Sequence, residues 1–463
     1  MKILTISFFD DNFGDMLIRI CFDRLMTVAL KNLGVSEDDF TVENMHIKEP
    51  DEDKIASADL ILFSGGAMFG FNNLGSFDMI DRITSIADEK HIPVVFSSLG
   101  INNMHATEES GARLNEILRR KCIRAMSVRE SVDAFTPFTD GCDFEIVSVC
   151  DPAVWAKHVY RKEVQAAKSA KKRRIVGLNV VRGGLFKANG HSWTLDSEEE
   201  YFKRLIALYD EKGIEYRFFT NGSVLDNNSM GYIAKRIGVP DDKLICPDSS
   251  RELVTAIAGF DAVMAIRMHS AIISYALDVP STDLVWNEKI PYFYQNTGYP
   301  SRAVKLKNCT PEVMLRMTGE LLDDAGFKAD DEYLMSLYRY LYTTIGMILN
   351  KPCDSPYDFA QVSHLLSLTE SGVADDVTDY RTKLSRAHYC YRVLFDADME
   401  RRRQLTKLKK EVKALKSQLK DYEEKYEGLE HESEEARSEI DRINRFFPVR
   451  VYHKLFGKKK NKK

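Results

Sequence analysis

The feature that most constrains the fold of this chain is a repeated alternation of short apolar runs with longer helix-like segments. The apolar runs include "KILTISF", "ADLILFSGG" and "IPVVFSSLG", and further along "IVGLNVVRGG", "EYRFFTNG" and "DAVMAIRMHS". Segments with helical periodicity, such as "MLIRICFDRLMTVALKNLG", separate them. Continuous apolar strands that alternate with helices are typical of parallel sheets covered by helices. The sequence therefore predicts an α/β fold.

The length of the chain, 463 residues, favours more than one domain. The alternation breaks at the basic, helix-prone segment "AKHVYRKEVQAAKSAKKRR", which we interpret as a linker. We predict two Rossmann-like domains, residues 1–160 on the acceptor side and residues 172–325 on the donor side. Since open α/β sheets bind ligands beyond the carboxyl ends of their strands, two such domains that face each other would share one cleft.

The last third of the chain has a different pattern. We predict a helical extension over residues 326–395, followed by a coiled coil over residues 399–446, because apolar positions there recur every three or four residues between charged ones. A single long helix lying on the body is the alternative. The stripe consists of Leu405, Leu408, Val412, Leu415, Leu419, Tyr422, Tyr426, Leu429, Ser433, Ala436, Ile440 and Ile443.

The C-terminal tail, residues 447–463, mixes aromatic and basic residues. The last fifteen residues carry seven Lys/Arg and no acid, although the whole chain has a net charge of −5. Aromatic side chains at a headgroup boundary and basic ones against anionic lipid would bind a membrane surface. A disordered solubilising tail and an RNA contact are the alternatives, and we expect no nucleic-acid partner.

Several function classes lack their motifs in this sequence. The start, "MKILTISFFDDNFGD", does not read as a signal peptide, and no apolar stretch approaches the length of a membrane span. The eight cysteines are scattered without a CxxC pair, which favours a reduced, cytoplasmic chain over a disulfide framework or zinc site. No metal motif, complete GxGxxG or P-loop is present. We expect neither a metal nor a cofactor.

The segment "DAVMAIRMHSAIISYAL" places two polar residues, Arg267 and His269, between an apolar strand and an apolar helix. Unpaired backbone N–H groups at a helix start attract phosphate or carboxylate, and we expect Ser270 to cap that helix. Arg267 would add a forked donor for the anion, and His269 a group that exchanges protons near neutral pH. The alternative is structural: Arg267 pairs with an interdomain carboxylate and His269 is a core residue.

Other strand ends point to the same cleft. Arg182 follows a strand in "NVVRGG", and Lys289 follows another in "STDLVWNEK", so both could help Arg267 to bind a small multiply charged anion. The first domain offers uncharged or acidic groups instead, which suit a hydroxyl-rich partner such as a sugar. These candidate acceptor-side residues are Asn12, Gly14, Asp15, Gly65, Gly66 and Asn102. Each Arg or Lys could instead form an ordinary salt bridge, and each Gly could serve a tight turn.

Taken in order, these segments resemble the polysaccharide pyruvyl transferase family over about residues 1–300. The resemblance is carried by "NFGDMLI", "LILFSGGAMF", "SVRES", "DPAVW", "IRMHSAIISYALDVP" and "WNEKIPYFYQNTG". The Arg-x-His pair before a helix, followed by Pro and then Lys, is its most specific part. Ala67 stands where the family usually has a third glycine, and the chain beyond about residue 330 lies outside the resemblance.

The resemblance implies a two-domain fold like that of the GT-B glycosyltransferases. It also implies transfer of pyruvate from phosphoenolpyruvate to two hydroxyls of a sugar, as a ketal. Arg267 and His269, and less directly Arg182, match the family's residues for phosphoenolpyruvate. Our hypothesis is that Arg267, Arg182, Lys289 and Ser270 bind the donor, that His269 transfers a proton, and that Asp15 is the base on the acceptor side.

Two alternatives remain open at this point. One is a GT-B-type glycosyltransferase with a nucleotide-sugar donor, and the other is a non-enzymatic scaffold for polysaccharide synthesis. Whichever function holds, the coiled coil predicts a homodimer. The tail predicts a peripheral location at the inner face of the cell membrane, where the acceptor could be a lipid-linked saccharide.

Overall fold

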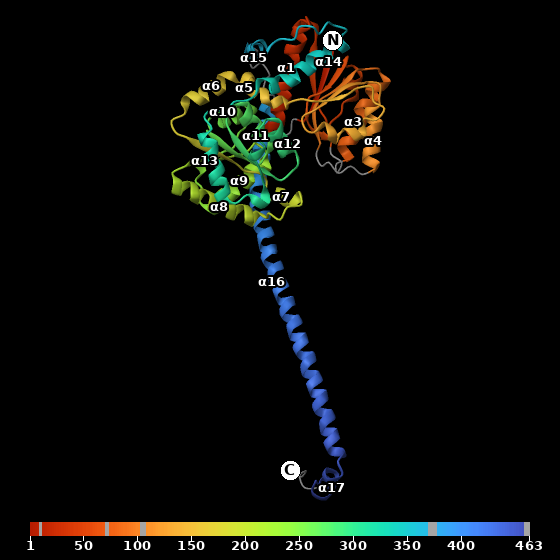
Figure 1. Ribbon diagram of the computed structural model, residues 1–463, viewed down its shortest axis with the longest axis vertical. Helices are drawn as coiled ribbons and strands as arrows, with labels where there is room; N and C mark the ends of the chain where they lie inside the picture. Colours follow the sequence, from red (N-terminus) through yellow and green to blue (C-terminus); the bar gives the residue numbers. More distant parts are fainter. Residues whose placement is uncertain (9–11, 70–73, 102–107, 369–376, 458–463) are drawn as a thin grey trace. The chain divides into compact units, whose positions relative to one another are not determined.

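We describe the fold from a computed structural model that covers residues 1–8, 12–69, 74–101, 108–368 and 377–457. It divides into two compact units, Met1–His388 and Tyr389–Lys463. The first unit contains two parallel β-sheets with their covering helices (Figure 1). The α/β class and the two sheets that the alternation predicted are confirmed.

The first sheet is seven-stranded, with the path β2-β1-β3-β5-β6-β7 and β4 paired to β5. All its pairings are parallel. The strand order changes direction between β1 and β3. The strands are β1 (Lys2–Ser7), β2 (Thr41–His46), β3 (Leu60–Phe63), β4 (Gly66–Phe69), β5 (Val94–Ile101), β6 (Ile123–Val128) and β7 (Ile146–Ser148).

Helices cover both faces of this sheet because its central strands are apolar on both sides. On one face, Ile61 and Phe63 pack with α3 (Leu74–Glu89) and α4 (Glu108–Leu118). On the other, Leu60 and Leu62 pack with α1 (Phe13–Asn32) and with α14 (Asp331–Ile348), which returns from far along the chain. The short α2 (Glu52–Ala56) lies beside α3.

The second sheet is six-stranded and parallel, with the order β10-β9-β8-β11-β12-β13. This is the 3-2-1-4-5-6 order of the Rossmann fold, which reverses between β8 and β11. The strands are β8 (Ile175–Asn179), β9 (Glu215–Phe219), β10 (Leu244–Ile245), β11 (Ala262–Ala265), β12 (Ser281–Val285) and β13 (Ala303–Lys305).

One hydrophobic core runs through both domains. Leu62 of the first sheet, Val263 of the second and Ile272 of α11 (Met268–Ala276) belong to the same buried cluster, together with α10 (Ser250–Ala258). The opposite face of the second sheet packs on α8 (Leu195–Lys212), α9 (Val224–Ile237) and α13 (Pro311–Asp323). Two short helices, α7 (Leu185–Ala188) and α12 (Lys289–Asn296), follow β8 and β12. The shared core explains why both domains form one unit.

The predicted linker is helical and is held by the chain's later part. It forms α5 (Ala156–Val159) and α6 (Arg161–Ala170). Trp155 Nε1, just before α5, donates to Leu334 O of α14 at 3.1 Å, and Tyr340 OH of α14 donates to Phe96 O of the first sheet at 2.9 Å. The following helix, α15 (Phe359–Leu368), packs on α5. Helices α14 and α15 lie within residues 326–395, where we predicted a helical extension.

The second unit consists of most of α16 (Val377–Arg445) and of α17 (Phe447–Phe456). The large apolar side chains of the predicted stripe, from Leu405 to Ile443, are 50–68% exposed. The chain therefore forms a continuous helix where we predicted a coiled coil, and its pairing with a second copy stays a prediction.

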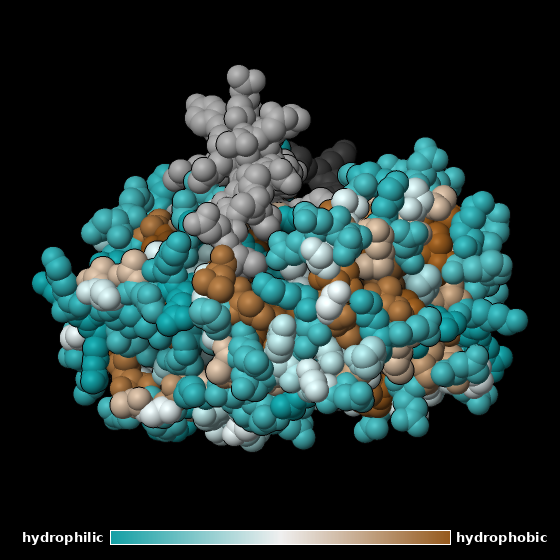
Figure 2. Space-filling view, turned by 90° about the horizontal axis from the view of Figure 1, so that it is seen from above, coloured by the Kyte–Doolittle hydropathy of each residue, from teal (hydrophilic) through white to brown (hydrophobic). Residues whose placement is uncertain are grey.

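The hydropathy of the surface fits a chain that buries most of its apolar residues in the cores described above. On the face shown in Figure 2, hydrophilic residues cover most of the area, and hydrophobic residues form small separate patches. Among the residues described, no helix combines the length and hydrophobicity that crossing a bilayer requires.

Candidate active site

The loops at the two points of strand reversal carry most of the predicted site residues. In the first sheet, Asn12, Gly14 and Asp15 follow β1, and Gly65 and Gly66 follow β3. The corresponding loops of the second sheet, after β8 and β11, carry Arg182 and Arg267. Loops that leave neighbouring strands in opposite directions open a crevice, which is where α/β proteins of this kind bind ligands.

The start of α1 lies directly against the second domain. Phe13 N donates to Asn221 O, in the loop after β9, at 2.9 Å. A Cβ atom on Gly14 would lie 2.5 Å from His269 Cβ, closer than real Cβ atoms approach. Gly14 is therefore needed because the backbone of α1 touches the His269 side chain, and the glycine does more than allow a turn.

His269 lies between two groups of the first domain. Its Nδ1 is 3.6 Å from Asp15 Oδ1, and its Nε2 is 3.5 Å from Arg129 Nη1. A guanidinium only donates, so the neutral tautomer that fits this contact accepts at Nε2 and carries its proton on Nδ1, on the side of Asp15. The buried imidazole thus lies between a carboxylate and a guanidinium of the opposite domain.

These surroundings shift the titration of His269. Burial lowers the pKa of the imidazole below its usual value, and the positive charges of Arg129 and Lys289 act in the same direction. The carboxylates of Asp15 and Asp151 oppose that shift. His269 is therefore neutral near pH 7, and Asp15 is the group that most favours its protonated form.

Asp15 is itself oriented by Asn12. Asn12 Nδ2 donates to Asp15 Oδ2 at 2.7 Å, while Asn12 Oδ1 caps α1 by accepting from Gly14 N at 3.1 Å. One side chain thus fixes both the helix start and the carboxylate beside His269. Of the predicted acceptor-side residues, Asn12, Gly14 and Asp15 come together with His269.

Arg129 and Asp151 are functional candidates that we did not predict. The buried Arg129 pairs with Asp151 through Nη1, and its Nε lies 3.7 Å from Glu130 Oε1. Burial alone would lower the pKa of Arg129, but the neighbouring carboxylates of Asp151 and Glu130 more than offset it and raise the pKa. Both residues follow strands, in "SVRES" and "DPAVW", so the strand-end rule that selected Arg267 could have found them.

Lys289 lies at the start of α12 and shares this electrostatic environment. Burial lowers the pKa of its ammonium group to about 8, and the charge of Arg129 adds to this effect. The carboxylates of Glu130 and Asp15 oppose it. A lysine in this range both binds anions and exchanges protons near neutral pH.

Arg267 pairs with a carboxylate of the protein itself. The structural alternative predicted such a pair, but with a carboxylate of the other domain. Its Nε and Nη2 donate to the two oxygens of the fully buried Asp226 at 2.9 and 2.7 Å. Asp226 belongs to α9 of the same domain, so the partner is not an interdomain carboxylate. Asp226 Oδ1 also accepts from Arg182 N at 2.7 Å, which ties the two arginine loops together.

The Arg182 side chain differs from that of Arg267. Within the described part of the chain, no hydrogen bond or ion pair occupies its guanidinium. The following residues, Gly183 and Gly184, shape the loop: Gly183 N donates to Ser229 Oγ at 2.8 Å, and Gly184 has a φ of 80°. The backbone of Arg182 is therefore held in place by Asp226, while these bonds leave its guanidinium unused.

The predicted role of Ser270 as a helix cap is wrong. Helix α11 begins at Met268 with Arg267 as its N-cap residue, so His269 and Ser270 lie in the first turn. The Ser270 hydroxyl is fully buried and donates to Asn221 Oδ1 at 2.6 Å. Ser270 thus joins α11 to the loop after β9, next to the bond that Asn221 forms with Phe13.

The remaining acceptor-side candidates divide into two groups. Gly65 and Gly66 have φ values of 106° and 97°, which only glycine adopts readily, and a Cβ on Gly65 would lie 3.2 Å from Ile18 of α1. Both glycines shape the loop beside α1. Asn102 lies outside the described residues. Among the residues that are described, no group of three or more His, Cys, Asp or Glu is arranged to hold a metal ion.

The fold and the site define a two-domain α/β protein whose candidate catalytic residues meet between two parallel sheets. The sequence model of the family described as "Polysaccharide pyruvyl transferase" matches residues 12–288, more than half of the chain. The chain belongs to the polysaccharide pyruvyl transferase family. No match was found among curated proteins.

Solved structures show where else this fold occurs. A protein from Listeria monocytogenes, assigned as a UDP-N-acetylglucosamine 2-epimerase, is 11% identical, with a TM-score of 0.50 over 77% of this chain and 99% of its own. The UDP-GlcNAc 2-epimerase of Neisseria meningitidis is 12% identical, with a TM-score of 0.47 over 74% and 99%. The Listeria match, at this low identity, shows the fold alone and supports the predicted GT-B-like arrangement.

Proposed function

We propose that this protein transfers pyruvate from phosphoenolpyruvate to two hydroxyl groups of a sugar, forming a ketal on a cell-surface polysaccharide or its precursor. The observation that carries the proposal is the meeting of His269, from the second domain, with Asp15 and Arg129, from the first. A transferase needs a proton-exchanging group within reach of both substrates, and this contact supplies one at the boundary between the domains.

The donor side of the proposed site is positively charged. Phosphoenolpyruvate carries a phosphate and a carboxylate, which arginine binds through paired hydrogen bonds. We assign donor binding to Arg182, Lys289 and Arg267, the last held in place by Asp226. Arg129 is an addition to this set, because its guanidinium lies beside His269.

In the proposed reaction, phosphoenolpyruvate is a co-substrate. The atoms and protons of the reaction balance without a resident metal or cofactor. A proton adds to the methylene carbon of phosphoenolpyruvate, which leaves a cationic centre at the neighbouring carbon. Two sugar hydroxyls bond to that carbon and lose two protons, while the C–O bond to phosphate breaks. One released proton replaces the one added to carbon, and the other leaves with phosphate.

The residues near His269 suggest how protons would move. We propose that His269 exchanges protons with the reacting groups and that Asp15 stabilises its protonated form. This extends the predicted role of Asp15, which we assigned only as a base for the acceptor hydroxyl. Lys289, with a pKa of about 8, is available as a second proton-exchanging group.

Release of phosphate is the direct test of the donor. The full-length protein, incubated with phosphoenolpyruvate and a saccharide extract of its host, should release phosphate only when the acceptor is present. Phosphoenolpyruvate should also raise its melting temperature, since a ligand that binds only the folded state stabilises it. Turnover of a UDP- or GDP-sugar in place of phosphoenolpyruvate would instead support a glycosyltransferase, and no turnover with either donor would support a scaffold.

We further propose that the second unit assembles and locates the enzyme. The exposed stripe of α16 would pair with that of a second copy as a coiled coil, giving a homodimer. Helix α17 carries exposed Tyr452, Leu455 and Phe456 together with Arg450 and Lys454, a composition that favours an anionic membrane surface. The dimer would thus hold two such helices at the inner face of the membrane, near a lipid-linked acceptor.

A further inference from the structure

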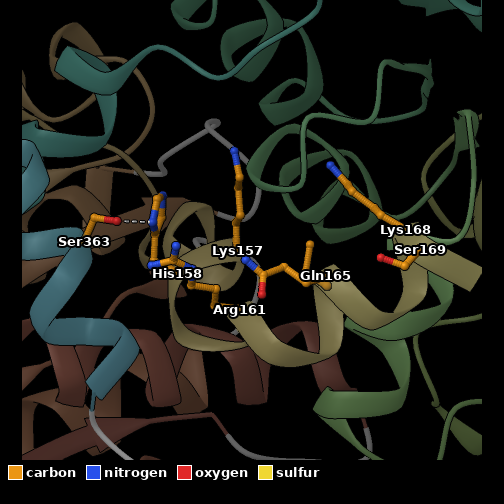
Figure 3. A pocket seen from close by; sticks show the side chains of 8 residues that line it. Lys157, His158, Arg161, Gln165, Lys168, Ser169 and Ser363 are labelled. Atoms are coloured by element: carbon orange, nitrogen blue, oxygen red, sulfur yellow. Dashed lines mark hydrogen bonds between the residues drawn. The ribbon is translucent and has the colours of Figure 1, made fainter.

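A pocket outside the candidate active site lies beside the linker helices. We call it the basic pocket, and it is lined by side chains of α5, α6 and α15, among them Lys157, His158, Arg161, Gln165, Lys168 and Ser363 (Figure 3). Its volume is about 440 Å³, within the range of small-molecule sites. None of its lining residues belongs to the proposed transferase site.

The charge of the basic pocket is positive. Lys157, Arg161 and Lys168 bring three cations, and Asp278, which pairs with Lys157, brings a negative charge to their edge. His158 adds none, because burial and the charge of Lys157 lower its pKa to about 4, and it shares a hydrogen bond with Ser363 of 2.6 Å. Excess positive charge in a recess selects anions.

Arg161 lines the basic pocket with a charged group that takes part in no described contact of the fold. Within the described part of the chain, no hydrogen bond or ion pair engages its guanidinium, although it stands at the first position of α6. Two other donors of the pocket, Gln165 and Ser169, are exposed on the same helix, four and eight residues further along. Residues at this spacing share one helix face, so the three groups point to the same side.

The lysines connect the basic pocket to the helix that carries His269. Lys157 pairs with Asp278, and Lys168 Nζ donates to Leu277 O at 2.7 Å, both at the C-terminal end of α11. In Figure 3 their side chains extend toward the same side. His269 lies in the first turn of that helix. An anion that draws the two ammonium groups toward itself would loosen their hold on α11.

We propose that the basic pocket binds the phosphate group of a small soluble phosphate ester and that this binding is linked to the hold on α11. Arg161 supplies the forked contact, Lys157 and Lys168 supply charge, and Gln165 and Ser169 supply neutral donors. The volume leaves room for more than the phosphate itself. The binding does not depend on the proposed transferase function, whereas any effect on turnover rests on it.

Calorimetric titration of the full-length protein tests this proposal without measuring turnover. Inorganic phosphate and glucose 6-phosphate are the probes. Both should bind the wild type, and Arg161→Gln and Lys168→Gln should each weaken binding by about tenfold or more, as expected for loss of a charged hydrogen bond. The matched control is Lys162→Gln, which removes an exposed cation next to Arg161 that does not line the pocket and should bind as the wild type does.

Two further measurements separate the basic pocket from the transferase site. Arg182→Gln, which alters the proposed donor site, should retain the binding that Arg161→Gln loses. Adding phosphate to the Arg182→Gln variant should increase amide hydrogen exchange in the last turn of α11, around Ala276. The proposal is overturned if Arg161→Gln binds both probes like the wild type, if Arg182→Gln abolishes all binding, or if exchange in α11 does not change.

Discussion

At the scale of single residues, His269 is defined by what surrounds it. Asp15 faces Nδ1 and Arg129 faces Nε2, so two opposite charges from one domain act on an imidazole of the other. The pKa of His269 is the balance of these charges and of burial. Small changes in the approach of the two domains would therefore alter its protonation.

Replacing Asp15 by Asn tests that balance. The Asp15 carboxylate raises the pKa of His269, so its removal should lower that pKa further below the usual value and leave the imidazole neutral down to a more acidic pH. A pH titration of the His269 ring protons by NMR measures the shift. Asp59→Asn, far from His269 in the sequence and at the opposite end of the sheet, is the control. An unchanged or higher His269 pKa would contradict the electrostatic role of Asp15.

Gly14→Ala tests the close approach of α1 to His269. The new methyl group would lie 2.5 Å from His269 Cβ, so either α1 or the imidazole must move, at a cost of roughly 1–3 kcal/mol. The midpoint of denaturant unfolding should fall accordingly. Gly319→Ala is the matched control, because nothing lies within 4 Å of the added atom and alanine favours the helix there. Equal stabilities of the two variants would show that the domains do not meet as described.

At the scale of elements, the pattern of the sequence located the strands and helices that are long and apolar. The predicted runs around β1, β8, β9 and β11 are strands, and the helix predicted from "MLIRICFDRLMTVALKNLG" is α1. Two of the strands that were not predicted, β2 and β4, illustrate the physical reason: β2 is half exposed and polar at an edge, and β4 is a four-residue strand that starts at a glycine. Neither produces a long apolar run or a clear alternation.

The candidate site was predictable only in part, for related reasons. Strand ends identify loops, so Arg182, Arg267, His269 and Asp15 could be found from the sequence. Which of them face a ligand depends on partners that the pattern does not show: Asp226 lies inside a helix, with no signal that it would pair with Arg267. Helix α11 starts at Met268 and so includes Ser270, whose buried bond to Asn221 is likewise a contact that the pattern does not show.

Helix α16 supports a prediction at the same scale. Exposing the apolar stripe of α16 to water costs free energy, and pairing with a second copy would bury that apolar surface. Leu415→Glu should therefore shift the protein from dimer to monomer, as measured by light scattering after size exclusion. Gln418→Glu, which adds the same charge outside the stripe, should remain dimeric. A wild-type protein that is monomeric at micromolar concentration would remove the coiled coil.

At the scale of the whole molecule, two features stand out. The core that runs from the first sheet into α10 and α11 makes the two α/β domains one folded unit, so the elements that carry the candidate site residues share one interior. In the described part of the second unit, the large apolar side chains from Leu405 to Ile443 are exposed instead of forming a core, and such residues are suited to partners. Our proposals accordingly place catalysis in the first unit and assembly and membrane binding in the second.

The proposed membrane contact of α17 can be tested with vesicles. The full-length protein should co-sediment with phosphatidylglycerol vesicles and much less with phosphatidylcholine vesicles, because each basic residue near an anionic surface contributes about 1 kcal/mol. Leu455→Ser with Phe456→Ser should reduce binding to the anionic vesicles. Binding that is equal for both lipids, or unaffected by the two substitutions, would contradict this assignment.

The central claim is that His269, at the contact between the domains, transfers protons in pyruvyl transfer from phosphoenolpyruvate. The most direct measurement is the appearance of the ketal methyl signal by NMR, with wild type and His269→Ala compared at equal concentration on phosphoenolpyruvate and a host saccharide. We predict that the wild type forms the ketal and that His269→Ala forms it about 10²–10⁴ times more slowly while remaining folded. Equal rates for the two proteins, or no ketal from the wild type, would contradict the account.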